Sequence, residues 1–236
     1  GNRPDYKKRL NGAKNKINDL VNQIDVFQPR FTIPFASFIW FSNQENYYMN
    51  DAINKIDSIE SIIDNAKSTP IILYPGDEYS IDDKINNSES VKKYMESYMN
   101  INTNNLLISK SVDLEDLRIT CKEFSKRIKS NYPFKWAILS FYPIKFFVED
   151  LDAMFKYSNF SGLNEIDKSD NVADINISSN MLHFCFKYDW GFNTAFVNAR
   201  FETNNKKINF QVYKLILDSI NNRTHAMIDI IKKVIL

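Results

Sequence analysis

One stretch constrains the fold of this chain more than any other. Residues Phe31 to Phe41 are apolar apart from Thr32, Pro34 and Ser37, and Pro29 stands just before them. An apolar run of this length, rich in Phe and Ile, predicts a strand that is buried on both faces. Such a strand needs a layer of structure on each side, so we expect a layered α/β arrangement.

Polar side chains crowd the end of this run. Glu45, Asn46, Tyr47 and Asn50 follow Phe41 closely. Polar groups at the end of a buried strand are where α/β proteins place their chemistry. We therefore predict a binding site that includes these four residues. The alternative is that Asn46 and Asn50 only cap and tie down a loop, as short amide side chains commonly do.

Ser37 and Asp77 complete the predicted binding set. A nucleophilic Ser37 would need a base, and no histidine is near it in the sequence. A hydroxyl that bonds the backbone is therefore the favoured interpretation of Ser37. Asp77 follows a second predicted strand, so Asp77 and Glu45 could share one edge of a sheet and serve as acid and base. Solvated loop carboxylates are the commoner outcome.

The first 80 residues alternate between helical and extended patterns. Apolar residues spaced by three and four predict a helix over 6–27 and a second over 51–66. A short buried strand is predicted over 70–74, and it ends in a turn whose Gly76 needs a positive φ. Residues 1–80 therefore predict a helix-strand-helix-strand unit, consistent with a right-handed crossover. The basic residues placed on the solvated side of the first helix are Lys7, Lys8, Arg9, Lys14 and Lys16.

Residues 81–236 predict a separate, smaller α+β domain after a polar boundary at 80–90. Alternation predicts a strand over 173–178, with a helix starting near residue 180. Trp190-Gly191 fits the end of that helix, with the glycine in a left-handed conformation. The last stretch, Ile208 to Leu236, is strongly apolar and predicts mostly helix. Its final residues, from Met227 to Ile235, predict an amphipathic helix that either closes the core or joins two copies of the chain in a homodimer.

The composition excludes several classes of function. Of 236 residues, 44% are hydrophobic, which is ample for a sizeable core. A net charge of +1 gives no electrostatic case for nucleic acid or an anionic membrane as a partner. No run reaches the roughly 18 apolar residues of a membrane span, and no secretory signal is visible. We therefore expect a cytoplasmic protein.

Few residues of this chain are suited to binding a metal ion. His183 and His225 are the only histidines. Cys121 and Cys185 are the only cysteines. Their spacing does not suggest a metal site, and a reduced pair is favoured over a disulfide. A dinuclear zinc or iron site needs several imidazoles and a bridging carboxylate. We therefore predict no metal or cofactor held by this chain alone.

Three segments of the first 80 residues resemble the C-terminal part of metallo-β-lactamase-fold metallohydrolases. They are Pro34 to Phe38, Glu45 to Asp51, and Ile71 to Asp77. In that family a helix leads through a Pro-Phe-Ala-Ser-Phe step into one of the last strands. A Glu-Asn … Asn-Asp segment follows, and then an apolar strand with a Pro-Gly-acid turn. The resemblance implies that residues 1–80 are the terminal portion of an αββα sandwich.

The chain departs from this family where a metal would bind. Hydrolases of this fold commonly bring a late histidine near the end of such a strand, and Asn43 and Gln44 stand there in this chain. The main metal motif of the family, two histidines followed by an Asp-His pair, is absent. The resemblance therefore implies one of two situations. Either an N-terminal metallohydrolase half that holds zinc or iron lies outside this sequence, or the protein is a non-catalytic relative.

A second resemblance covers residues 174–202. This segment is similar to small α+β domains of the sterol-carrier type, which have a strand, a helix under an apolar pocket and a closing sheet segment. Trp190, Gly191, Arg200 and Phe201 would lie in that closing segment. The resemblance implies a pocket for an apolar ligand or a docking domain.

The sequence thus leads to two hypotheses of function. In the first, the chain is the C-terminal section of a metallo-β-lactamase-fold hydrolase and shapes a substrate cleft whose metal ligands come from elsewhere. In the second, it is a non-enzymatic module that binds an apolar small ligand in its second part or a protein partner through its last helix. Neither hypothesis identifies the substrate or the ligand.

Overall fold

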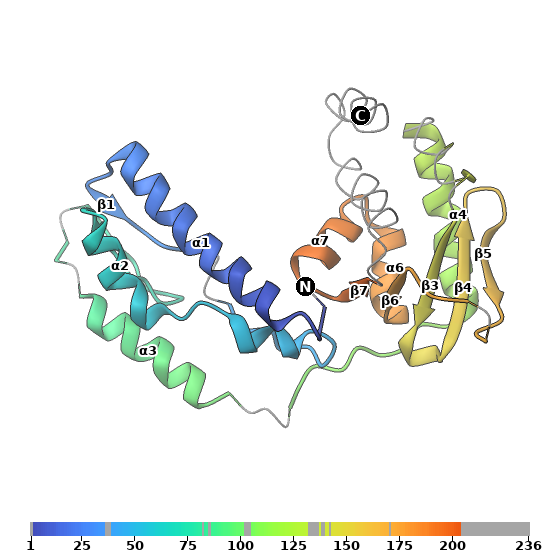
Figure 1. The fold of residues 1–236 in the computed structure, drawn as a ribbon, viewed down its shortest axis with the longest axis horizontal. Helices are drawn as coiled ribbons and strands as arrows, with labels where there is room; N and C mark the ends of the chain where they lie inside the picture. Colours follow the sequence, from blue (N-terminus) through green and yellow to red (C-terminus); the bar gives the residue numbers. More distant parts are fainter. Residues whose placement is uncertain are drawn as a thin grey trace. The chain divides into compact units, whose positions relative to one another are not determined.

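The computed structural model is that of an α/β protein with helices and a mixed sheet. Its internal contacts divide the chain into two compact units, Arg3–Leu107 and a second unit that begins at Ile108 (Figure 1). This boundary differs from the predicted one at 80/81, because the helix over 87–99 packs with the first unit. The residues described are 2–35, 39–81, 83–84, 86–101, 105–131, 137, 140–141, 143–169 and 171–203.

The first unit is mostly helical and contains very little sheet. Its long helix α1 spans Tyr6–Phe27, as the sequence predicts. Its remaining helices are shorter, and its two strands have two residues each. The order after α1 is β1 (Phe31–Thr32), η1 (Tyr47–Ala52), η2 (Ile56–Ser58), α2 (Ile59–Asn65), β2 (Thr69–Pro70) and α3 (Asn87–Met99).

Isoleucine side chains form the core of the first unit. The sequence predicts an inner face of the second helix made of Ile53, Ile56, Ile59, Ile62 and Ile63. Ile56, Ile59 and Ile63 are at most 1% exposed, whereas Ile53 and Ile62 are only half-buried. Ile24 of α1 and Ile72 join the three buried residues in one cluster. The helix itself is shorter than predicted, since the chain is 3₁₀ over η1 and η2 and becomes α-helical only at α2. The core therefore depends on three short pieces in place of one long helix.

The prediction of a buried strand over Phe31–Phe41 is wrong. Among the described residues of the run, only those of β1 pair, in parallel with β2, and the chain leaves the ladder at Ile33. Pro34 has no N–H to donate, so it cannot extend a ladder. Ile33 and Phe35 are 45% and 81% exposed, so this part of the run does not lie inside a sandwich. Each described residue of the run is half-buried or exposed.

Asn87 satisfies backbone groups that a wider sheet would otherwise pair. Its Oδ1 accepts from the N–H of Ile72 at 2.8 Å, and its Nδ2 donates to the carbonyl oxygen of Pro70 at 2.9 Å. The same Nδ2 donates to a carboxylate oxygen of Glu60 at 2.9 Å. Asn87 is 8% exposed, so water cannot easily replace these bonds. One side chain thus joins α3 to α2 and to the end of β2.

We predict that Asn87→Ala destabilises the protein by about 2–4 kcal/mol, because it leaves a buried N–H and a buried carbonyl without partners. Asn65→Ala is the matched control, since Asn65 is an exposed amide at the end of α2 in the same unit and should change stability by no more than about 0.5 kcal/mol. Urea unfolding of both variants measures the difference. Equal midpoints for the two variants would contradict the role assigned to Asn87.

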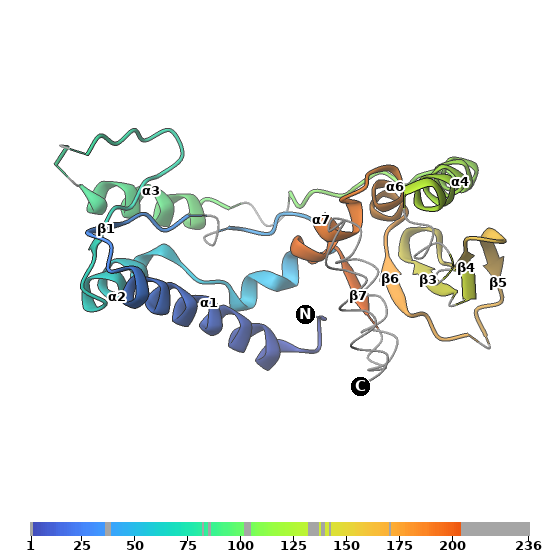
Figure 2. The same cartoon turned by 90° about the horizontal axis from the view of Figure 1, so that it is seen from above.

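The second unit is a five-stranded mixed sheet with helices packed on one face. The strand order is β5-β4-β3-β6-β7, with β3 and β6 parallel and the other neighbours antiparallel. Figures 1 and 2 both show α4 and α6 on the same side of this sheet. The elements are α4 (Leu114–Asn131), β3 (Ile144–Val148), η3 (Glu149–Leu151), β4 (Ala153–Ser158), β5 (Gly162–Ile166), β6 (Ile175–Ile177), α6 (Ser179–Lys187), α7 (Gly191–Val197) and β7 (Phe201–Thr203).

Aromatic rings fill the space between the sheet and its helices. Phe124 of α4 lies with its ring centroid 5.3 Å from that of Phe186 of α6 and 6.0 Å from that of Tyr157 of β4. All three residues are at most 2% exposed. Burial raises the pKa of the Cys121 thiol to about 12, since the charged form has no water around it. Cys121 is therefore a packing residue of this core.

The start of α6 is confirmed close to the predicted position. Ser178 is its N-cap and accepts from the N–H of Met181 at 3.3 Å. The neighbouring Ser179 is fully buried, and its hydroxyl donates to Asp150 of η3 at 2.5 Å and accepts from the N–H of Val112 at 2.8 Å. These bonds tie the helix start to two other segments.

Gly191 has a different structural role from the one predicted. It is the first residue of α7, and it is not among the described residues with a positive φ. A Cβ at this position would lie 2.6 Å from the Cα of Cys185 and 2.6 Å from the carbonyl oxygen of Phe184. Glycine is required because α6 and α7 approach closely here, and not because the chain turns left-handed. By contrast, Gly76 has the predicted positive φ, at 94°.

We expect Gly191→Ala to destabilise the protein by about 1–3 kcal/mol, because the new methyl group would push against the backbone of α6. Gly12→Ala is the control, since a Cβ at Gly12 meets nothing within 4 Å. That substitution should raise stability by roughly 0.5–1 kcal/mol through helix propensity. Thermal unfolding distinguishes the two. A stabilised Gly191→Ala variant would contradict the close approach of the helices.

The C-terminal stretch Ile208 to Leu236 lies outside the described residues. It includes the amphipathic helix that the sequence predicts. The homodimer suggested for it stays a prediction. Among the described helices, none combines the length and the hydrophobicity that crossing a lipid bilayer requires.

Candidate functional site

A hollow of the first unit lies between α1 and the segment 39–54. We call it the α1 cleft. Its volume is about 510 Å³, which is within the range of small-molecule sites. Its floor is apolar, its helical wall carries cationic and amide side chains, and Gly12 leaves room at the centre of that wall. The lining residues are Lys8, Arg9, Asn11, Gly12, Ala13, Asn15, Lys16, Ile39, Phe41, Met49, Ala52, Ile53 and Asn54.

Asparagine side chains hold the loop wall of the α1 cleft in place. Asn50 accepts from the N–H of Phe41 at 2.9 Å and donates to the carbonyl oxygen of Phe41 at 2.8 Å, so it pairs with Phe41 as a neighbouring strand would. Asn54 donates to the carbonyl oxygen of Ala13 at 2.9 Å and so fixes the loop to α1. Both wall residues Phe41 and Asn54 are therefore positioned by side-chain amides.

Arg9 anchors the end of the cleft near the start of α1. Its guanidinium forms two bonds with Asp51, from Nε at 3.2 Å and from Nη2 at 2.5 Å. It also lies over the rings of Tyr48 and Tyr6, at 5.1 and 5.9 Å from their centroids. The side chain is 3% exposed, so the prediction that it lies on the solvated side of the helix is wrong. Its charge is compensated by Asp51 and is mainly structural.

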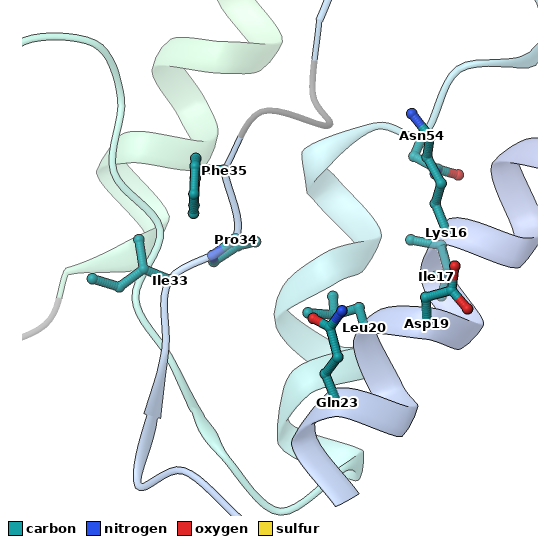
Figure 3. Close-up of a pocket in the computed structure, with 9 residues that line it drawn as sticks. All are labelled: Lys16, Ile17, Asp19, Leu20, Gln23, Ile33, Pro34, Phe35 and Asn54. Atoms are coloured by element: carbon teal, nitrogen blue, oxygen red, sulfur yellow. The ribbon is translucent and has the colours of Figure 1, made fainter. Parts of the chain in front are cut away.

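A second hollow, of about 310 Å³, continues along α1 on the other side of Asn54. Figure 3 shows Ile33, Pro34 and Phe35 on one side of it and the α1 residues on the other. It shares Lys16 and Asn54 with the α1 cleft, so the two hollows adjoin. The residues that line it are Lys16, Ile17, Asp19, Leu20, Gln23, Ile33, Pro34, Phe35 and Asn54.

The predicted site residues near η1 have mainly structural surroundings. Asn46 is 2% exposed, and its backbone starts η1 by accepting from the N–H of Met49 at 3.0 Å. Tyr47 packs edge-to-face against Trp40 with ring centroids 6.1 Å apart. Glu45 is half-buried beside them in the chain. Asn50, as described, bonds the backbone, which agrees with the alternative that it ties down a loop. Ser37 lies outside the described residues.

Asp77 has its own set of partners on α3 and in the preceding turn. Its carboxylate accepts from Lys93 Nζ at 2.8 Å, from the N–H of Tyr74 at 2.9 Å and from Ser90 Oγ at 2.7 Å. These bonds, with the one from Lys93 the strongest, lower the pKa of Asp77 to about 2. A carboxylate held in its charged form in this way is poorly suited to donate a proton near neutral pH.

The α1 cleft contains residues that the sequence did not single out. The sequence places Lys8 and Lys16 on a solvated helix face and assigns no role to Gly12. The one local signal was Gly12 itself, because an isolated glycine inside a helix costs stability and often has a packing or functional reason. The pairing of α1 with residues 39–54 is a long-range contact, so no local pattern could have revealed it.

Metal binding finds no support among the residues described. No group of three or more His, Cys, Asp or Glu side chains lies close enough together there to hold an ion. His183 of α6 is half-buried, and His225 lies outside the described residues. Comparison of the chain with protein-family models, curated proteins and solved structures found no match.

The Asp77 cluster gives a prediction on pH. The pKa of the Asp77 carboxyl is lower in the folded protein than the value of about 3.9 in an unfolded chain. The stabilisation is therefore present above about pH 4 and is lost as the pH falls toward 2. Asp77→Asn should lower the urea midpoint at pH 7, and its difference from the unchanged protein should shrink between pH 4 and pH 2.

Glu78→Gln is the control for this experiment, because it removes an exposed carboxylate from the same turn. It measures the general effect of one lost charge on the urea midpoint. If Asp77→Asn lowered the midpoint equally at pH 7 and pH 2, the link between Asp77 ionisation and stability would be refuted.

Proposed function

We propose that this chain is the C-terminal section of a metallo-β-lactamase-fold hydrolase-like protein, and that its first unit shapes part of the substrate cleft. The observation that carries this proposal is the α1 cleft. One wall of the cleft comes from Phe41, Met49 and Ile53, which lie in and beside the Glu45 to Asp51 segment of the family resemblance. The α1 cleft is thus formed in part by one of the segments that carry the family resemblance.

The lining of the cleft suits binding better than bond cleavage. The described side chains that line it are apolar, amide or cationic, and none of them is a carboxylate, thiol, hydroxyl or imidazole. Such a surface can hold and orient a molecule, whereas hydrolysis needs a nucleophile or an activated water. We therefore propose that the zinc or iron ligands belong to an N-terminal metallohydrolase half, and that this chain contributes substrate contacts.

The crossover in the first unit supports the proposed place in a layered sandwich. β1 and β2 are parallel, and α2 lies between them in the chain. A strand-helix-strand unit of this kind is the building block of layered α/β folds. We propose that these short strands form the terminal portion of an αββα sandwich.

A cytoplasmic location is part of the same proposal. Cys121 and Cys185 are both free and buried. Free thiols are the usual state in a reducing compartment. Both belong to the core of the second unit, so their reduced state is also the one compatible with its packing.

The gene upstream of Gly1 provides the first test. We expect it to encode two histidines followed by an Asp-His pair, and we expect the full protein to contain zinc or iron by elemental analysis. An upstream reading frame without a histidine-rich motif would overturn the hydrolase proposal.

The second test fills the cleft. Gly12→Leu places a side chain where a Cβ meets nothing within 4 Å, so it should fold while occupying the α1 cleft. We predict that it weakens binding of the neutral dye Nile red by at least about tenfold, or ~1.4 kcal/mol, as measured by fluorescence titration. Gly12→Ala is the control and should bind like the unchanged protein. Equal binding by the two variants would show that the cleft does not hold ligands.

A second candidate function has its own supporting observation. The chain runs from β6 through α6 and α7 to β7, with these helices against an apolar core. This order agrees with the strand, helix and closing segment of sterol-carrier-type domains, and Gly191, Arg200 and Phe201 lie in the part from α7 to β7. The second unit would then be a non-enzymatic module for an apolar ligand. Native mass spectrometry tests it, since a clean monomer without ligand would count against it.

A further inference from the structure

We infer that the α1 cleft binds an anionic amphiphile, a molecule with an acidic group and a linear apolar chain. This inference rests on the proposed function, because it names the class of molecule that the same cleft accepts. It is carried by the distribution of charge and of apolar surface around α1.

The charges that line the α1 cleft have one sign. Lys8, Arg9 and Lys16 line it, and no carboxylate does. Arg9 is compensated by Asp51. Neither Lys8 nor Lys16 has an ion-pair partner in the part of the chain that the structure describes. Two uncompensated ammonium groups on one helix face favour an acidic group placed between them.

The apolar surface of the cleft is the reason for proposing that the ligand has an apolar chain. Phe41, Met49 and Ile53 are only half-buried, and Ile39 is 42% exposed. Beyond Asn54 the second hollow adds Ile33 and Phe35, whose side chains are 45% and 81% exposed. Exposed apolar side chains along two adjoining hollows are typical of a binding site. A linear chain lying along α1 would cover it.

The position of Asp19 orients the ligand. Asp19 lines the second hollow but not the α1 cleft. Its carboxylate would repel an acidic group in the second hollow. The acidic group therefore belongs in the α1 cleft near Lys8 and Lys16, and the end of the chain lies toward Leu20 and Phe35.

The experiment compares three probes with the same twelve-carbon chain: dodecanoate, 1-dodecanol and dodecyltrimethylammonium. Each displaces Nile red from the purified protein at low salt and below its micelle concentration. We expect dodecanoate to bind about three- to tenfold more tightly than dodecanol, as two partly exposed ion pairs allow. The cationic probe should bind most weakly.

Variants of the lysines test the placement of the acidic group. Lys8→Gln combined with Lys16→Gln should weaken dodecanoate binding more than dodecanol binding, so that the preference for dodecanoate is lost. Lys14→Gln is the matched control, because Lys14 is exposed on the same helix but does not line the cleft. It should keep the preference.

The outcomes separate this inference from the proposed function. If dodecanol binds as tightly as dodecanoate while Gly12→Leu still blocks both, the cleft is a ligand site but the inference of an anionic ligand is overturned. If the double lysine variant keeps the preference for dodecanoate, the placement at Lys8 and Lys16 is overturned. If Gly12→Leu leaves binding of every probe intact, the proposed function fails, and the inference fails with it.

Discussion

The first unit depends on amide side chains that take the place of a sheet. Its two strands pair over only two residues each. Asn50, Asn54 and Asn87 bond backbone groups of Phe41, Ala13, Pro70 and Ile72, which a wider sheet or longer helices would otherwise satisfy. Because a buried backbone group without a partner costs free energy, these amides decide which irregular path the chain can follow. The second unit satisfies its backbone in the ordinary way, through five paired strands.

The same dependence explains where the first unit becomes hollow. A loop held at a few points by Asn50 and Asn54 does not close fully onto α1, and Gly12 adds no side chain to fill the gap. The wall that the loop forms is apolar because it continues the apolar run of the sequence. The opposite wall is cationic because α1 carries its lysines there. The α1 cleft is thus a consequence of how the loop is attached.

The sequence predicted those parts of the fold that local patterns determine. Helix α1, the buried isoleucines around Ile59 and the start of α6 near residue 180 follow from periodicity, and all three were found. The apolar run led to a wrong prediction of a buried strand, because apolar composition does not show what covers a strand. Pro34 also ends the pairing. The sequence did not predict most of the candidate site, because the two walls of the cleft are distant in the sequence. In addition, an asparagine that bonds the backbone cannot be distinguished by sequence from an asparagine in an active site.

Pro34 also bears on the behaviour of the chain before it has folded. The segment around Ile33, Phe35 and Ile39 is rich in β-forming residues, carries no charge and stays partly exposed in the native protein. Segments of that composition are templates for intermolecular β-pairing and aggregation. A proline within such a segment removes a hydrogen-bond donor from any intermolecular β-ladder and so disfavours aggregation. The residue that stops β1 after two positions therefore also protects an exposed apolar segment from self-association between chains.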